Sequence, residues 1–150
     1  MRGSSLSLVL AILAHGAAAQ EPGSAEITLP DHILFLATDL ALPGPPLVLW
    51  QEDGGLQAQF AQLHLRFPLP PHLTVTLRQI EGGAWQIDTL SLDQLGMDAD
   101  YHGRPGDLRI TQSDLSDAWL RLRIEGRVTP DTLGMAQPVQ IDLRVPLPPR

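Results

Sequence analysis

The chain has 150 residues, a formal net charge of −7 and no cysteine. Its length suits one domain that buries a core without disulfide bonds. The negative charge disfavours nucleic acids and anionic membrane surfaces as partners, because binding to either requires a concentrated basic face.

The first part of the chain has the order of a secretory signal peptide. Arg2 precedes an apolar run from Leu6 to Ala14, and small residues follow as far as Ala19. The run is far shorter than the roughly 20 apolar residues of a membrane-spanning helix. We therefore expect cleavage after Ala19, no transmembrane segment in the mature chain, and a periplasmic or secreted location. The predicted organisation is a signal peptide over 1–19 and a single β domain over 20–150.

Alternating apolar and polar residues predict β-strands along most of the mature chain. Residues 31–42 fit either a strand or a short helix capped by Asp31, and we favour the strand. Clear alternation, which is typical of strands with one buried face, covers residues 63–67, 73–77, 120–125 and 141–145. The phase of the alternation changes near residues 61–62 and again between Ile87 and Leu90, so we expect a bulge or bend at each place.

Three turns are predicted between residues 47 and 92. Asp53-Gly54 and Gly82-Gly83 separate alternating segments and indicate hairpins, because glycine accepts a positive φ angle. The run Pro68-Leu69-Pro70-Pro71 indicates the turn between them, because consecutive prolines cannot donate to a strand ladder. The four strands of this region are therefore expected to be antiparallel neighbours. The predicted fold class is all-β: a single antiparallel β-sandwich or a small β-barrel with meander hairpins.

The remaining segments are more polar or richer in proline. Residues 94–107 are interpreted as a loop, and residues 113–117 as a turn that leads into Trp119. Residues 145–150 contain three prolines and are expected to form an extended, proline-rich tail.

One acidic segment could bind a cation. Asp98, Asp100 and Gly103 match the spacing at the start of a helix-loop-helix calcium loop, but Arg109 stands where the last carboxylate is needed. An irregular calcium site of Asp98, Asp100 and Asp107 is the metal hypothesis. The favoured interpretation is a solvated loop whose aspartates and glycines make turns, so the sequence predicts no cofactor, with calcium as the alternative.

A row of arginines gives the main binding hypothesis. Trp119, Arg121, Arg123 and Arg127 share one parity and would lie on one face of a strand. Guanidinium groups in such a row could hold a carboxylate or phosphate, and the indole could stack on a ligand ring. The competing and favoured interpretation is a solvated face on which these arginines pair with aspartates such as Asp142.

The sequence predicts no catalytic residues. It has neither a thiol nor a lysine amine, and no serine lies in a nucleophile elbow. A triad of Ser113 or Ser116 with His102 and an aspartate is the one catalytic arrangement left open.

The three tryptophans, Trp50, Trp85 and Trp119, are widely separated in the sequence. Core packing is the usual role of such aromatic residues. We therefore interpret them as core aromatics and not as a carbohydrate platform.

These observations favour a non-enzymatic module of the cell envelope that acts in protein interaction or as an accessory subunit. Its partner would be an envelope or secreted protein. The alternative is a periplasmic carrier that holds a lipid or another apolar small molecule inside a barrel or between sheets. A small hydrolase is the second alternative.

Overall fold

The computed structural model describes residues 21–39, 47–64, 67–95, 99–132 and 134–150. They form ten β-strands and one turn of 3₁₀-helix: β1 (Gly23–Thr28), β2 (Ile33–Thr38), β3 (Val48–Trp50), β4 (Leu56–His64), β5 (Phe67–Gln79), β6 (Trp85–Leu95), β7 (Ala99–Gly103), η1 (Pro105–Asp107), β8 (Leu108–Leu115), β9 (Trp119–Pro130) and β10 (Gln137–Pro146). No helix within these ranges is long and apolar enough to cross a membrane. The predicted signal peptide lies outside the described residues.

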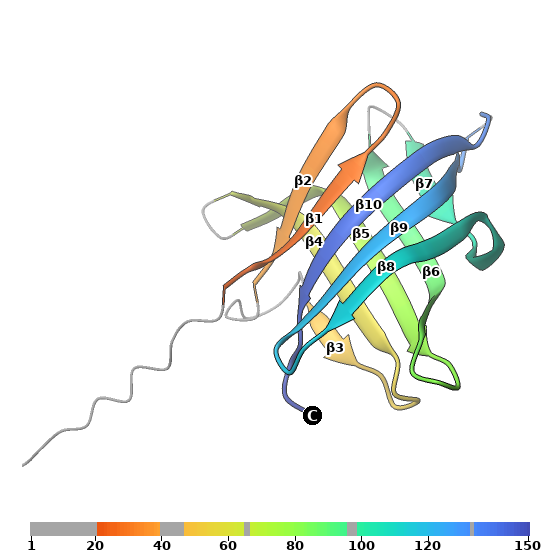
Figure 1. The fold of residues 1–150 in the computed structure, drawn as a ribbon. Coiled ribbons are helices and arrows are strands. Elements are labelled where there is room, and N and C mark those ends of the chain that lie inside the picture. The colour runs from red at the N-terminus through yellow and green to blue at the C-terminus, as the bar shows by residue number, and fades with distance from the viewer. Residues whose placement is uncertain (1–20, 40–46, 65–66, 96–98, 133) are drawn as a thin grey trace, which may run out of the picture.

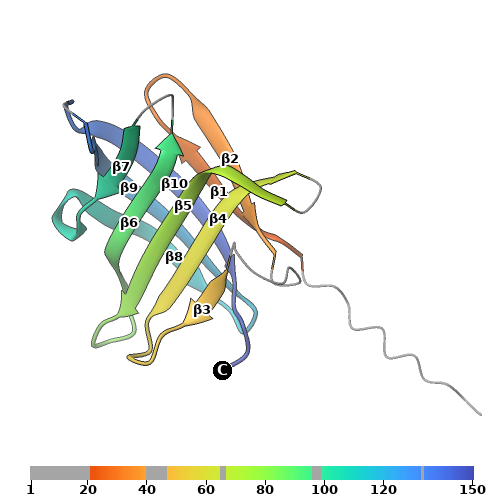
Figure 2. The ribbon, with the colours of Figure 1, turned by 180° about the vertical axis from the view of Figure 1, so that it is seen from behind.

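Eight of the strands close into one antiparallel barrel (Figures 1 and 2). The order around the ring is β10, β1, β2, β4, β5, β6, β7, β9, and the pairing of β9 with β10 completes it. Two strands lie outside this ring: β3 pairs with β4, and β8 pairs with β9. The all-β prediction is confirmed, and of its two forms the structure has the small barrel.

The interior of the barrel is filled by apolar side chains. An eight-stranded barrel has an interior that its own side chains can fill or that can hold one small ligand. Here the largest fully buried side chains come from strands all around the ring: Phe60, Ile27, Leu56, Leu73, Leu77, Leu90, Leu92, Leu120, Ile124, Ile141, Val75 and Val128. The barrel therefore encloses a packed hydrophobic core.

The predicted hairpins and bulges are confirmed. Gly54 has a φ of +83°, and Gly82 and Gly83 have φ of +90° and +81°, in the turns between β3 and β4 and between β5 and β6. The β4–β5 register shifts between Ala61 and Gln62, and the β5–β6 register shifts between Thr76 and Leu77. The strand predicted within residues 31–42 is β2.

The turn predicted at Pro68–Pro71 is wrong. Strand β5 begins before these residues and runs through them, with Pro68 opposite Leu63 and Leu69 opposite Gln62. The next pair is His72 with Ala61, so Pro70 and Pro71 fall within the register shift. Prolines are tolerated there because residues in a bulge need not donate to the ladder.

The loop predicted over residues 94–107 is also wrong in part. Its middle forms β7, which pairs with both β6 and β9, and η1 follows. The hydrogen bonds between strands are made by backbone groups. A polar segment such as β7 can therefore complete the ring, although it lacks the alternation of apolar and polar side chains that indicates a strand. Tyr101 anchors β7 by packing against the core.

Two phenylalanines allow a matched test of the core. Phe60 is 0% exposed, and Phe35 on β2 is 68% exposed. We expect Phe60→Ala to lower the free energy of unfolding by about 3–5 kcal/mol, because it leaves a cavity in the barrel. Phe35→Ala should change it by no more than about 0.5 kcal/mol. Urea denaturation followed by circular dichroism measures both. Equal losses in the two variants would contradict the assignment of Phe60 to the core.

Candidate binding site

A hollow of about 750 Å³ lies at one end of the barrel. The strand ends that line it belong to β3, β6 and β9, and this end of the barrel, with β3 and the C-terminus, is lowest in Figures 1 and 2. All three tryptophans of the chain line it: Trp50, Trp85 and Trp119. The other lining residues are Glu21, the turn from Leu115 to Ala118, and the segment Leu147–Arg150. We call this hollow the tryptophan pocket.

The fold brings the tryptophans together because each stands at a strand end on the same side of the barrel. Trp50 is the last residue of β3, while Trp85 and Trp119 are the first residues of β6 and β9. Neighbouring antiparallel strands run in opposite directions. The last residue of β3 and the first residues of β6 and β9 therefore lie at the same end of the barrel. The interpretation of these residues as core aromatics is therefore correct for Trp85, which is 8% exposed, and correct in part for the half-buried Trp50, which packs against the core; it is wrong for Trp119, which is half-buried and lies against Arg144.

Arginines lie over two of the indole rings. The Arg144 guanidinium carbon is 4.0 Å from the centre of the Trp119 ring, and that of Arg150 is 4.3 Å from the centre of the Trp50 ring. Arg144 also forms an ion pair of 2.8 Å with Glu21. A cation over an indole face is attracted by the ring quadrupole, so these contacts hold the two rings in place.

Two nitrogen atoms in this region are buried without a hydrogen-bond partner among the described residues: Nε1 of Trp85 and Nε of Arg144. By contrast, Nε1 of Trp50 donates to the carbonyl oxygen of Pro148 at 2.9 Å. A buried donor without an acceptor costs about 1–3 kcal/mol. These nitrogen atoms are thus either covered by the protein or already bonded, and the surface that the pocket offers to a ligand is mainly aromatic.

The predicted arginine row is divided between two parts of the barrel. Arg121 and Arg123 line a second hollow of about 390 Å³ on the outer face of β8, β9, β10 and β1, beside Trp119. Nε of Arg123 donates to Asp142 at 2.7 Å, and this hydrogen bond raises the pKa of Arg123. Arg127 lies toward the other end of β9 and donates to the carbonyl oxygen of Ala136 at 2.6 Å. The structure thus places Arg121 and Arg123 in one hollow and Trp119 in the tryptophan pocket, and it leaves Arg127 apart from both.

The residues of the calcium hypothesis are described only in part. Asp98 lies outside the described residues, Asp100 is on β7, and Asp107 is in η1. Within the part of the chain that the structure describes, no three histidine, aspartate or glutamate side chains form a group that could hold a metal ion.

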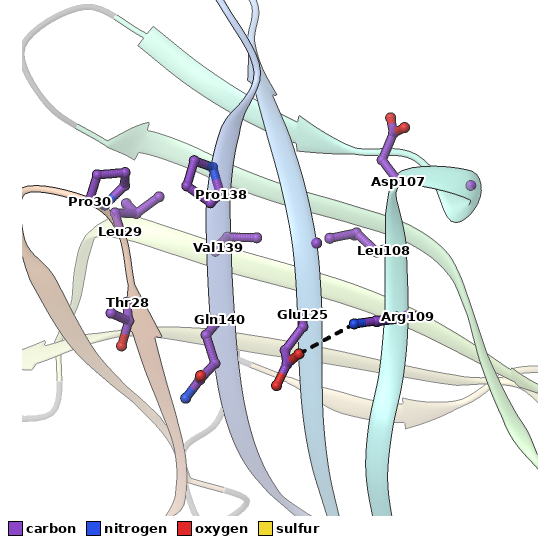
Figure 3. A pocket seen from close by; sticks show the side chains of 12 residues that line it. Thr28, Leu29, Pro30, Asp107, Leu108, Arg109, Glu125, Pro138, Val139 and Gln140 are labelled. Atoms are coloured by element: carbon purple, nitrogen blue, oxygen red, sulfur yellow. Dashed lines mark ion pairs between the residues drawn. The ribbon is translucent and has the colours of Figure 1, made fainter.

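Asp107 lines a third hollow, of about 550 Å³, near the opposite end of the barrel. Figure 3 shows its carboxylate turned away from Arg109 and Glu125, which form an ion pair of 3.8 Å. Leu29, Leu108 and Val139, all nearly buried, supply apolar surface in this hollow.

The groups of the proposed triad are not brought together. His102 lies on β7 and contacts Asp131 at 2.8 Å, near the end of the barrel opposite the tryptophan pocket. Ser116 lies in the β8–β9 turn, and its Oγ accepts a hydrogen bond from the Trp119 backbone N–H at 3.1 Å. Ser113 is on β8 opposite Leu122, whereas His102 is opposite Thr129, seven residues further along β9. His102 is therefore separated from both serines along β9.

Sequence reasoning missed the tryptophan pocket although a signal for it was present. Trp50 precedes the Asp53-Gly54 turn, and Trp85 follows the Gly82-Gly83 turn. In a meander these two turns are two strands apart and must lie at the same end of the sheet. The parity of the turns was thus sufficient to place two of the three rings together.

Comparison with known proteins gives no assignment: no protein-family model, no curated protein and no solved structure matches the chain.

Replacing Trp85 by phenylalanine tests the unpartnered indole N–H. The substitution removes a buried donor that has no acceptor, which offsets the loss of part of the ring. We expect the free energy of unfolding of Trp85→Phe to stay within about 1 kcal/mol of the wild-type value. Trp85→Ala should lose about 3–5 kcal/mol. Urea denaturation gives both values, and a loss in Trp85→Phe as large as that in Trp85→Ala would show that the N–H is bonded.

Proposed function

We propose that the protein is an exported, non-enzymatic interaction module of the cell envelope and that a protein partner binds at the tryptophan pocket. The observation that carries the proposal is the gathering of all three tryptophans in one open hollow, with Arg150 stacked on Trp50 inside it and Arg144 stacked on Trp119 at its edge. Tryptophan and arginine are among the residue types that contribute most to the affinity of protein interfaces.

The pocket is built on rigid elements, which favours binding. Each tryptophan belongs to a strand of the sheet, and the backbone ladders of β4, β5 and β10 fix the positions of Trp50, Trp85 and Trp119. A site whose side chains are already held loses little conformational entropy when a partner binds.

The interior of the barrel supports this proposal over a carrier of apolar molecules. A carrier would hold its cargo among the inward-facing residues. Phe60, Leu73 and Ile141 are each 0% exposed and belong to one packed cluster. Surface binding therefore agrees better with the packing than an internal cargo does.

The separation of the candidate catalytic groups supports it over a hydrolase. A triad needs hydrogen-bond contact between the nucleophile and its base. His102 is opposite Thr129 in the ladder, whereas Ser116 contacts Trp119, at the other end of the same strand. Ten residues of strand span roughly 33 Å, so these groups are far apart.

The proposed exported location rests on the signal peptide expected from the sequence.

Capture of the partner tests the proposal. The mature protein, immobilised and incubated with an envelope extract of the source cells, should recover one protein in stoichiometric amount. Trp119→Ala should lower the affinity for that protein about 30-fold, because interface tryptophans contribute about 2 kcal/mol or more. The affinity is measured by calorimetry with the purified partner.

Arg127→Ala is the matched control. It alters an exposed residue on the same strand, away from the pocket, and should bind like the wild type. Circular dichroism verifies that both variants are folded. The proposal is overturned if no stoichiometric partner is recovered, or if Trp119→Ala binds the recovered protein as tightly as the control.

A further inference from the structure

The tryptophan pocket already holds a short segment of the chain itself. After β10, residues Leu147-Pro148-Pro149-Arg150 lie along one side of the pocket. The backbone N–H of Leu147 donates to the carbonyl oxygen of Ala118 at 2.9 Å. Trp50 donates to Pro148, and Arg150 stacks on the Trp50 ring, as described above. The first two residues of the tail predicted over 145–150 belong to β10, and the four residues after them lie against the barrel.

These contacts have the chemistry of proline-rich peptide recognition. Prolines cannot donate backbone hydrogen bonds, so a proline-rich segment is extended and presents free carbonyl oxygens. Proteins that bind such segments use aromatic grooves, whose rings pack on the prolines. The pocket supplies the groove through Trp50, and the indole N–H supplies the donor for the Pro148 carbonyl.

We propose that the part of the partner that enters the tryptophan pocket is an extended, proline-rich segment with an arginine, and that it replaces the chain's own Leu147–Arg150 segment. This inference rests on the proposed function, because it concerns the same pocket. The contacts of Leu147–Arg150 show how such a segment binds. A second peptide of similar sequence could make the same contacts once the chain's own segment has left the groove.

Charge supports an arginine in the partner segment. The chain carries a formal net charge of −7, and Glu21 and Asp117 line the pocket. A cationic segment is attracted to this surface, and opposite charges across an interface favour both encounter and the correct register. An acidic segment would meet like charges at the same place.

The chain's own segment must then compete with the partner. A tethered ligand acts at an effective concentration in the millimolar range. A partner segment that needs the same groove therefore binds more weakly than it would to an empty groove. Weakening the tethered segment should strengthen binding of the free one, whereas a ligand that binds beside the segment would show no such effect.

The probe is the synthetic peptide Val-Pro-Leu-Pro-Pro-Arg, capped at both ends, which copies residues 145–150. It is titrated into the full mature chain and followed through the indole N–H signals in nitrogen–proton NMR spectra. The chain has three tryptophans, so three such signals report on the pocket directly. The full-length variant Pro148→Gly/Pro149→Gly weakens the tethered segment and leaves the three tryptophans of the pocket unchanged.

We expect the peptide to shift the Trp50 indole signal and to bind the double-glycine variant about tenfold more tightly than the wild type. A peptide with alanine in place of each proline should bind at least tenfold more weakly. In Trp50→Phe, which keeps a ring and removes the N–H donor, binding should weaken as well. Dispersed backbone signals in the same spectra verify that each variant is folded.

Three results would overturn the inference: equal affinity for the wild type and the double-glycine variant, equal affinity of the proline and alanine peptides, or unchanged indole signals throughout. If the extract experiment still yields a partner that depends on Trp119, the interaction module stands and only the proline-rich segment is rejected. If that experiment fails too, both proposals are rejected.

Discussion

The ladder between β9 and β10 is the constraint on which the rest of the structure depends. It runs without interruption from the pair Gln137 and Val128 to the pair Pro146 and Trp119. Without this ladder the sheet would be open, with long unpaired edges at both strands. The chain has no cysteine, so no covalent bond could substitute for it. Closure also sets Trp119 beside the last residue of β10, which is where the following segment leaves the barrel and meets the pocket.

Strand β9 shows how one alternating sequence serves both the core and the surface. Leu120, Leu122 and Ile124 are buried, with exposed fractions of 3% or less. The residues between them, beginning with Trp119, face outward. Because the side-chain period of a strand is two, a shift of the β9–β10 register by one residue would exchange these faces. The packing of the core therefore fixes where Trp119 and its neighbouring arginines stand.

Most strands and two hairpins could be predicted from the sequence because their signals are local. Alternation identifies the buried face of a strand, and Asp53-Gly54 and Gly82-Gly83 identify turns by backbone conformation. Closure could not be predicted, because pairs such as Ala25 with Leu143 join residues far apart in the chain. Alternation along a strand indicates which of its two faces is buried, but it does not indicate which other strand pairs with it. The prolines of β5 led to the wrong prediction of a turn. Residues without an N–H group are compatible with a bulge inside a strand as well as with a turn, and the sequence alone does not distinguish the two.

The site was harder to predict than the fold because it is made by strand ends. The arginine row on β9 could be identified by parity, but its members have different roles that depend on neighbouring strands: Arg123 pairs with Asp142 on β10, and Arg127 bonds a backbone carbonyl. The tryptophans belong to β3, β6 and β9, which are adjacent neither in sequence nor in the sheet. The three tryptophans lie together because their turns are at the same end of the sheet and because the sheet closes into a barrel. The closure of the barrel could not be predicted from the sequence.

Binding is proposed at one end of the barrel because of what the remaining surfaces can offer. The interior is occupied by the core. On the outer face, Arg78 with Asp88, Arg109 with Glu125 and Arg123 with Asp142 are paired within the chain. Exposed pairs of this kind contribute little and would have to be separated from each other before they could bind a partner. At the tryptophan end the arginines stack on indole rings and leave aromatic surface beside a hollow. A partner that brings apolar surface to this end would gain contacts without breaking an ion pair of the outer face.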